Sequence, residues 1–315
     1  MIITRLSGGL GNQMFQYAAA RALALRHGTH VAIDTSYYTP RHIRRAQLDV
    51  FPCVLNNAPR IRSWFARRQR HAGLGWMRSL PGAPYWYREH GYREHEYRKH
   101  AYRKHGYRKH GQTEHGLGER AFGFDELVLE LPASCYLQGY FQSPRYFADC
   151  ARLIREDFCF PALTDSSNRQ LAAQIDGRCA VAIHVRLRDY LHQRGSSSTH
   201  HVLEASYYQR AMAELNNTLA SPRYFLFTDD PERAARMHWE SPVQLIAHNH
   251  GVDAFRDMQL MSRCTHQIIA NSSFSWWAAW LNSNRAKRVI APRNWFHPDS
   301  GHSTHDLIPA DWCLL

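Results

Sequence analysis

The sequence has no apolar run that approaches the roughly 18 residues of a membrane-spanning helix. Its seven cysteines are odd in number and contain no C-x-x-C pair, which disfavours a disulfide framework or a zinc site and predicts buried, reduced thiols. The first residues enter a strand-like pattern without the basic, apolar and cleavage regions of a secretory leader. These absences together predict a protein that stays in the cytosol.

Negative charge is also scarce. The chain has 27 Asp and Glu against 39 Lys and Arg, which gives a formal net charge of +12. This balance suits an anionic partner, which could be nucleic acid, a membrane surface or a phosphorylated small molecule. Hydrophobic residues make up 44% of the 315 residues, so the chain can bury a large core, and its length favours two domains.

Residues 87–116 contain a five-residue repeat. Tyr87-Arg-Glu-His-Gly91 is followed by four further Tyr-Arg-(Glu/Lys)-His copies and a degenerate one. A period of five matches neither the helix period of about 3.6 nor the strand period of about 2, so we expect a solvated insertion. Eight Arg and Lys against three Glu in residues 87–111 give +5, and peripheral contact with an anionic membrane is the alternative. Metal binding by its histidines is disfavoured, because a spacing of five does not align them on one helix face.

A glycine-rich turn follows the first predicted strand. Residues 2–6 are predicted as a strand, residues 8–11 as a tight turn, and residues 12–26 as a helix with Asn12 as its N-cap. A second strand at residues 30–34 completes a βαβ unit. In open parallel sheets, ligands bind where such turns leave the carboxyl ends of the strands.

The turn only partly matches a dinucleotide-binding fingerprint. Gly9 and Gly11 fit the first two glycine positions, but Met14 stands where a third small residue is needed for close helix–strand packing. A sugar-nucleotide or phosphate role is therefore favoured over NAD binding.

From residue 179 onward, apolar strand patterns alternate with amphipathic helix patterns. Strands are predicted at residues 179–185, 223–227, 243–246, 266–270 and 287–290, with helices between them. This alternation indicates a second parallel sheet and an α/β fold class.

Three polar loops follow strands of this second sheet: His184-Val-Arg186-Leu-Arg188-Asp189-Tyr190, Thr228-Asp229-Asp230 and Asn271-Ser-Ser-Phe-Ser275. They offer guanidinium groups for phosphate, carboxylates for the N–H donors of a guanine, and a ring that can stack on a base. Each loop alone also has a structural interpretation, as a surface ion pair, a helix cap or the start of a Trp-rich core helix.

Four motifs together resemble those of the α-1,2-fucosyltransferases, glycosyltransferase family eleven. They are Gly8-Gly-Leu-Gly-Asn-Gln-Met-Phe-Gln-Tyr-Ala18, His184-Val-Arg186, Phe227-Thr-Asp-Asp230 and Ile269-Ala-Asn-Ser-Ser-Phe-Ser-Trp-Trp-Ala-Ala-Trp-Leu281. The resemblance covers nearly the whole chain except roughly residues 55–120. It implies a GT-B-like fold of two Rossmann-like domains, an acceptor domain over residues 1–150 and a donor domain over residues 151–315.

The resemblance also implies the reaction. The donor would be GDP-L-fucose, and transfer to the 2-hydroxyl of a galactoside would invert the anomeric carbon without a metal or other cofactor. The acceptor would be a galactose-terminated glycan or a lipid-linked oligosaccharide, and nucleic acid would not be a partner. Peripheral contact with the inner face of the cell membrane would suit such an acceptor.

Roles for individual residues follow from the same resemblance. Arg186 would hold the diphosphate with His184 beside it, Asp229 would bind the guanine edge, and Phe274 would stack on the base. The remaining donor contacts are implied for Gly9, Gly11, Asn12, Arg188, Ser272, Ser273 and Ser275. The general base that takes the acceptor proton would be Asp189 or His201, although Asp189 could instead orient Arg186.

One position departs from the family pattern His-x-Arg-Arg-x-Asp-Tyr. Leu187 stands in place of the second arginine, and Arg188 stands where glycine is usual. The loss of a guanidinium at the leaving group removes several kcal/mol of transition-state stabilisation. The alternative function is therefore a degenerate, non-catalytic relative that binds a sugar nucleotide or a glycan.

Overall fold

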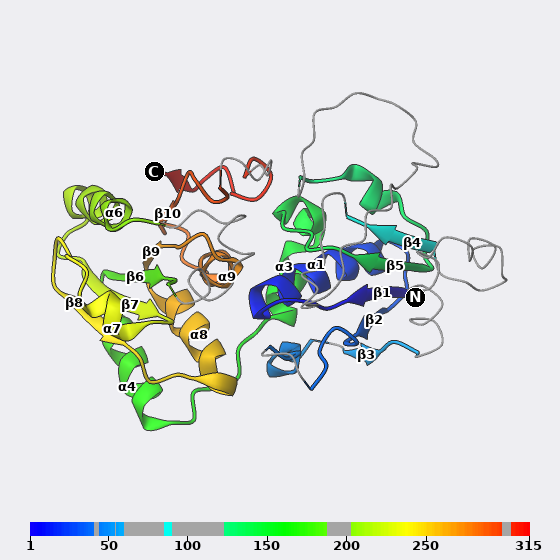
Figure 1. Cartoon of the computed structure of the whole chain (residues 1–315), viewed down its shortest axis with the longest axis horizontal. Helices are drawn as coiled ribbons and strands as arrows, with labels where there is room; N and C mark the ends of the chain where they lie inside the picture. Colours follow the sequence, from blue (N-terminus) through cyan, green and yellow to red (C-terminus); the bar gives the residue numbers. More distant parts are fainter. Residues whose placement is uncertain (41–43, 54, 60–84, 90–122, 188–202, 298–303) are drawn as a thin grey trace, which may run out of the picture.

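The computed structural model describes residues 1–315 except 41–43, 54, 60–84, 90–122, 188–202 and 298–303. The described chain forms two α/β units that lie side by side, each built on one parallel sheet (Figure 1). All strands of the first sheet lie within residues 2–138, and all strands of the second lie within residues 180–314.

The first sheet has the strand order β3-β2-β1-β5-β4, and every neighbouring pair is parallel. Its strands are β1 (Ile2–Arg5), β2 (Val31–Asp34), β3 (Asn56–Asn57), β4 (Tyr85–Arg88) and β5 (Cys135–Gln138). Helix α1 (Leu10–Arg26) packs in one cluster with Ile2, Ile33 and Leu137 of this sheet. It stops before Gly28, whose φ of 57° confirms the predicted glycine stop.

Short helices connect the first sheet to the second. They are η1 (Leu48–Val50), η3 (Glu126–Glu130), η4 (Pro144–Cys150) and α3 (Ala151–Asp157). The predicted helix start at Ser143 is confirmed, because the Ser143 hydroxyl accepts a hydrogen bond from the Arg145 N–H and begins η4. Phe158 then leads into the segment that joins the two units.

The second sheet has the order β11-β10-β9-β6-β7-β8 and is also parallel throughout. Its strands are β6 (Ala180–Val185), β7 (Arg223–Thr228), β8 (Val243–Ile246), β9 (His266–Ile268), β10 (Val289–Ala291) and β11 (Cys313–Leu314). Its helices are α4 (Ser166–Ile175), α6 (Ala205–Thr218), α7 (Pro231–Ala235), η5 (Gly251–Ala254), α8 (Phe255–Arg263) and α9 (Ser273–Leu281). In this part of the chain and in the rest of the described residues, no helix is both long and apolar enough to cross a bilayer.

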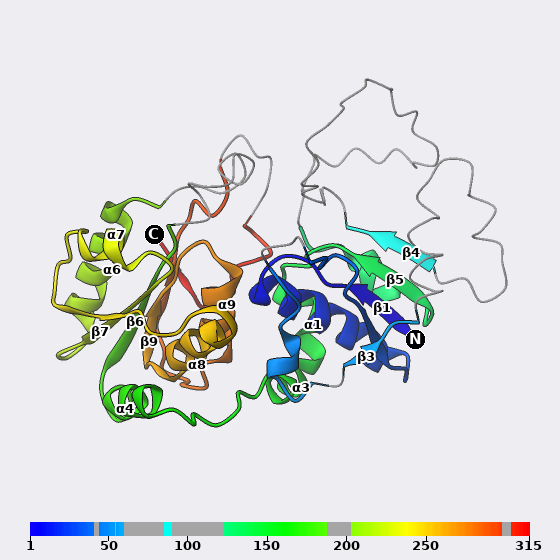
Figure 2. The same cartoon turned by 60° about the horizontal axis from the view of Figure 1, so that its bottom comes forward.

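Side chains of β6 divide between the two faces of the second sheet. Val181, Ile183 and Val185 pack with α6, whereas Ala180 and Ala182 belong to the cluster that contains α8 and α9. Figure 2 shows the same division, with α8 and α9 on the side that faces α1 and α6 on the far side. The alternation follows from the two-residue period of a strand.

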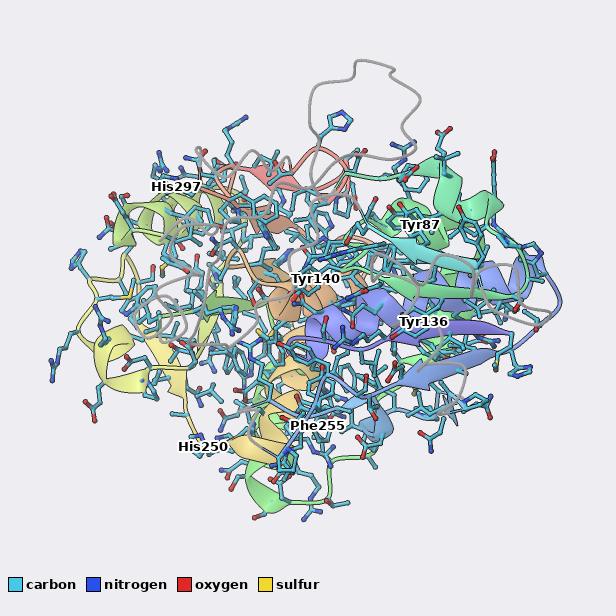
Figure 3. All side chains as sticks on the ribbon, turned by 45° about the vertical axis from the view of Figure 1, so that its right-hand side comes forward. Tyr87, Tyr136, Tyr140, His250, Phe255 and His297 are labelled. Carbon is cyan, nitrogen blue, oxygen red and sulfur yellow. The ribbon has the colours of Figure 1, made fainter. Side chains whose placement is uncertain are left out.

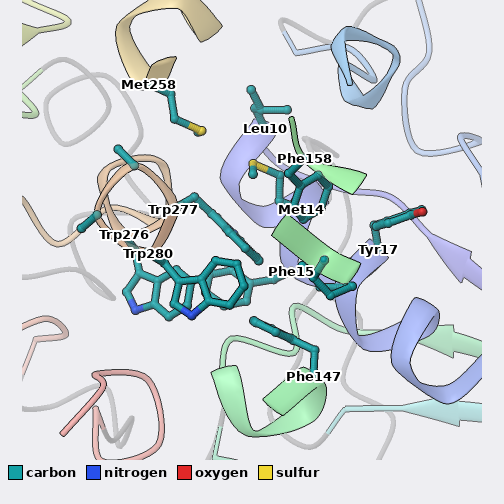
Figure 4. Packing of buried hydrophobic residues seen from close by; sticks show 14 of the residues in the cluster. Leu10, Met14, Phe15, Tyr17, Phe147, Phe158, Met258, Trp276, Trp277 and Trp280 are labelled. Atoms are coloured by element: carbon teal, nitrogen blue, oxygen red, sulfur yellow. The ribbon is translucent and has the colours of Figure 1, made fainter. Parts of the chain in front are cut away.

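Aromatic side chains from both units form one continuous core (Figure 4). The Phe15 ring centroid lies 4.6 Å from that of Trp276 and 4.9 Å from that of Trp277. Phe147 stacks on Trp277 at 5.5 Å and an interplanar angle of 19°. The tryptophans of α9 are therefore core residues, as predicted, and they join the two units through an apolar contact.

The prediction that Asn12 caps α1 is wrong. The helix begins at Leu10, and Gly9 occupies the cap position without a side-chain hydrogen bond. Gly8 adopts a φ of 76°, a left-handed conformation that lets the chain enter the helix earlier than the polar Asn12 indicates. Asn12 is consequently the third helical residue, and its side chain reaches the second unit.

The first copy of the repeat is also not a solvated insertion. Tyr87 and Arg88 complete β4, which pairs with β5 at the edge of the first sheet. The Tyr87 hydroxyl donates a 2.6 Å hydrogen bond to Asp125, and Glu89 is only 3% exposed. The copy is ordered because its tyrosine and glutamate find partners in the core. Residues 90–122, which hold the other copies, lie outside the described residues.

Candidate active site

The N-terminal ends of α1 and α9 meet where the two units face each other. At Gly11, a Cβ atom would lie 2.4 Å from the Ser273 carbonyl carbon and 2.6 Å from the Phe274 nitrogen, so only glycine fits. The Trp277 Nε1–H donates a 2.9 Å hydrogen bond to the Gly11 carbonyl. The glycine-rich turn therefore brings two positive helix ends together across the boundary.

Asn12 links three segments at this meeting point. Its Oδ1 accepts a 2.7 Å hydrogen bond from the Ser273 hydroxyl and a 2.9 Å hydrogen bond from Gln142 Nε2. Gln142 lies in the loop after β5, so the carboxyl edge of the first sheet contacts the first turn of α9. The predicted proximity of Asn12 and Ser273 is thus present, whereas Gln142 was not predicted.

Arg186 lies beside the start of α9. Its Nη1 donates to the Ser272 Oγ at 3.5 Å, and Ser272 is the N-cap of α9, accepting from the Phe274 N–H at 3.4 Å. A guanidinium and the N–H groups of a helix start both favour an anion. The arrangement brings two of the predicted loops to one place, the end of β6 and the turn after β9.

His184 is a neutral imidazole in this arrangement. Its side chain is 6% exposed, and burial, followed by the charge of Arg186, lowers its pKa to about 3. Its ring centroid lies 5.8 Å from that of Phe274, at an angle of 36°. His184 therefore supports the Phe274 ring and brings no positive charge to the site at neutral pH.

Asp229 and Asp230 hold backbone in different ways. The Asp229 Oδ1 accepts a 2.7 Å hydrogen bond from the Leu187 N–H and so joins the end of β7 to the loop after β6. Asp230 accepts from the Arg233 N–H and caps α7, which is the structural interpretation of that residue. Leu187 itself is half-buried, and its side chain packs against the α6 side of the second sheet.

The prediction that Ser275 binds a phosphate or ribose is wrong. Its side chain is fully buried, and its hydroxyl donates to the backbone carbonyls of Ala270 and Ser272. A helical side chain two residues after Ser273 points to the opposite side of the helix, which here is the core. Gly9 lies at the turn, where an added Cβ would be 3.0 Å from Arg44 Nη1.

Several predicted site residues fall outside the described part of the chain. They are Arg188, Asp189 and His201. The described residues contain no group of three or more His, Cys, Asp or Glu that could hold a metal ion. The site built from described residues is thus a cationic, hydroxyl-rich and aromatic one: Asn12, His184, Arg186, Ser272, Ser273 and Phe274.

Residues 120–314 match the profile of glycosyl transferase family 11. The chain belongs to this family. The match covers the whole second sheet and the Arg186, Asp229 and Ser272 loops, so the family resemblance seen in the motifs is confirmed, and this family 11 member is a glycosyltransferase by descent.

Two relatives from Escherichia coli are similar to this family 11 chain. The O-antigen biosynthesis glycosyltransferase WbnK is 33% identical over 136 residues, which is 43% of this chain and 44% of the relative. An alpha-1,2-colitosyltransferase is 25% identical over 338 aligned positions, covering 100% of this chain and 99% of the relative. The alignment with the first relative thus spans less than half of either protein.

Solved fucosyltransferase structures share the architecture. POFUT1 in complex with GDP-fucose has a TM-score of 0.50 at 10% identity, over 92% of this chain and 97% of that chain. Arabidopsis thaliana FUT1 in complex with GDP has a TM-score of 0.49 at 14% identity, over 98% and 74%. At such identities the likeness concerns the fold, and the α/β, GT-B-like prediction is confirmed.

Proposed function

We propose that this family 11 protein transfers L-fucose from GDP-β-L-fucose to the 2-hydroxyl of a galactoside in a glycan. The observation that carries the proposal is the position of Arg186 at Ser272, the cap of α9, next to the Phe274 ring. A guanidinium, a helix N-terminus and an aromatic ring in one place suit a nucleoside diphosphate. Asp229, at the neighbouring strand end, is proposed as the guanine contact.

The proposed reaction is a single in-line displacement. The acceptor oxygen attacks the anomeric carbon, the bond from that carbon to the diphosphate oxygen breaks, and the configuration inverts. Arg186 and the N–H groups at the start of α9 stabilise the negative charge that builds on the leaving GDP, in the role that a metal has elsewhere. The acceptor proton goes to a general base, for which Asp189 and His201 are the candidates.

The donor sugar is the first quantity to test, because the full-length relative is a colitosyltransferase. Purified protein is given GDP-L-fucose or GDP-L-colitose with a panel of galactosides in the presence of EDTA, and the product linkage is determined by NMR. We expect an α-1,2-linked fucoside. Preference for GDP-L-colitose would replace the donor, and loss of turnover in EDTA that returns with a divalent metal would overturn the metal-independent mechanism.

Leu187 motivates a second candidate function, a non-catalytic protein that binds a sugar nucleotide. Its side chain packs with the apolar residues on the α6 side of the sheet, so no guanidinium from this position reaches the anion site. Under this candidate the protein binds GDP but transfers no sugar to any galactoside. The variant Leu187→Arg with Arg188→Gly would then gain activity, whereas unchanged turnover would show that the departure from the family pattern does not matter.

A further inference from the structure

A carboxylate is buried at the carboxyl end of β4. Glu89 follows the last residue of the strand, and its side chain is 3% exposed. One carboxylate oxygen accepts the Tyr140 N–H at 2.5 Å, and the other accepts the Phe141 N–H at 3.0 Å. Two consecutive backbone N–H groups that converge on one anion form a nest, and here the anion is a side chain of the protein itself.

The turn that forms this nest has an unfavourable backbone. Phe141 adopts a φ of 51°, which is uncommon for a bulky residue without a compensating contact. Gly139 precedes it, and a Cβ there would lie 2.4 Å from the Glu89 Cβ. The 139–142 turn is therefore shaped around the Glu89 side chain, and its conformation depends on the two bonds that the carboxylate accepts.

The same turn reaches the anion site. Gln16 of α1 donates a 2.9 Å hydrogen bond to the Gly139 carbonyl, which fixes the turn against the start of the first helix. The last residue of the turn, Gln142, donates to Asn12, and Asn12 also accepts from Ser273 at the first turn of α9. Figure 3 shows Tyr140, which belongs to this turn, between the two units, with Tyr87 of β4 to one side.

No cation compensates for the burial of this carboxylate. The titratable groups that face Glu89 are Asp125, Tyr87 and Tyr146, and no Arg, Lys or His of the described residues forms an ion pair with it. Burial raises its pKa to about 7, although the two N–H donors act in the opposite direction. A buried acid with such a perturbed environment beside a binding site is characteristic of functional positions.

We propose that Glu89 is a positioning residue of the transferase site. Its carboxylate fixes the 139–142 turn so that Gln142 holds the Asn12 side chain against the start of α9. This inference rests on the proposed function, since it assigns a role within that same site. Removing the carboxylate loosens the alignment of the two units at the reacting centre, while the donor contacts on the second unit remain.

Kinetics of Glu89→Gln test the proposal, with Glu94→Gln as the matched control. Glu94 stands in an identical Tyr-Arg-Glu-His sequence of the repeat. We expect Glu89→Gln to lower kcat about 10- to 100-fold with little change in the KM for the GDP-sugar, as a misplacement of about 1 Å does. Glu94→Gln should retain wild-type kcat. Equal kcat in the two variants would overturn the proposal.

A double-mutant cycle with Gln142→Leu separates positioning from general loss of stability. If Glu89 acts through Gln142, the single Gln142→Leu variant loses kcat to a similar extent, and the double variant is no slower than the slower single one. Multiplied losses would contradict the proposed connection. Gln142→Leu also keeps the test valid if Glu89→Gln does not fold, because it leaves the buried carboxylate in place.

Hydrogen exchange gives an answer that does not depend on turnover. In Glu89→Gln, we expect faster amide exchange in the peptide that contains residues 139–142 and also in the peptide at the start of α9, with Glu94→Gln unchanged in both. Faster exchange confined to residues 139–142 would overturn the positioning role. If wild-type protein shows this coupling but transfers no sugar, the proposed function fails and the link between Glu89 and α9 stands.

Discussion

The substitution Gly11→Ala tests how closely the two units are packed. The new methyl group would lie 2.4 Å from the Ser273 carbonyl carbon and 2.6 Å from the Phe274 nitrogen, and both of these are backbone atoms that cannot rotate away. Relief requires α1 and α9 to separate by about 1 Å, since carbon atoms prefer about 3.5–4.0 Å. That movement weakens the 2.9 Å bond from Trp277 to the Gly11 carbonyl and the 2.7 Å bond from Ser273 to Asn12.

The expected loss is about 3 kcal/mol of unfolding free energy. Overpacking contributes about 1–3 kcal/mol, and the two weakened hydrogen bonds contribute about 1 kcal/mol each, while the helix propensity of alanine returns less than about 1 kcal/mol. For a chain of this size the loss lowers the Tm by about 5 °C in calorimetry. Gly9→Ala is the control, because its methyl would meet only the mobile tip of Arg44, at 3.0 Å. Equal Tm values for the two variants would refute the close approach at Gly11.

Three further predictions concern the site and its surroundings. Arg186→Ala should lower kcat/KM by about 10²–10³, the effect of losing one oxyanion contact, whereas Arg223→Ala, exposed at the opposite end of the second sheet, should not; equal losses would remove Arg186 from the mechanism. Ser273→Ala should weaken GDP binding in calorimetry and the buried Ser275→Ala should not, and the reverse order would restore the phosphate role of Ser275. Because the pKa of Glu89 is about 7 in the folded protein, above its ordinary value, the unfolding free energy should fall by about 3 kcal/mol as pH rises from about 4.5 to 7; in urea titrations this fall should be smaller by that amount in Glu89→Gln, and parallel curves would contradict the burial of the acid.

Sequence patterns suffice for the two sheets because parallel strands are buried on both faces. β1, β6 and β9 are short apolar runs bounded by glycine or polar residues, and such runs are recognisable without any tertiary information. The polar residues at their carboxyl ends were also predictable as a group, since those ends share an edge of the sheet. Arg186 and Ser272 meet for this reason.

Contacts between distant segments were not predictable in the same way. Asn12 has the composition of a helix cap, and nothing near it in the chain indicates that its partner is Ser273, 261 positions away. Ser275 shares its chemistry with Ser273, and only the helical periodicity, applied to a correctly placed helix start, separates the exposed hydroxyl from the buried one. Glu89 was missed because the repeat surrounds it with copies of its own sequence, so local composition predicts solvent exposure where β4 and the core provide partners.

The aromatic contact between α9 and the first unit limits how modular this chain can be. Trp277 stacks on Phe147 and lies near Phe15, so an isolated second half would leave these indole faces in water, where they favour aggregation. The same helix begins at the proposed anion site, so the residues that recognise the donor sit on the element that joins the two halves. A chimera that exchanges one half for that of another glycosyltransferase must therefore carry a matching aromatic surface, and recombination at the junction is restricted even where the catalytic loops are compatible.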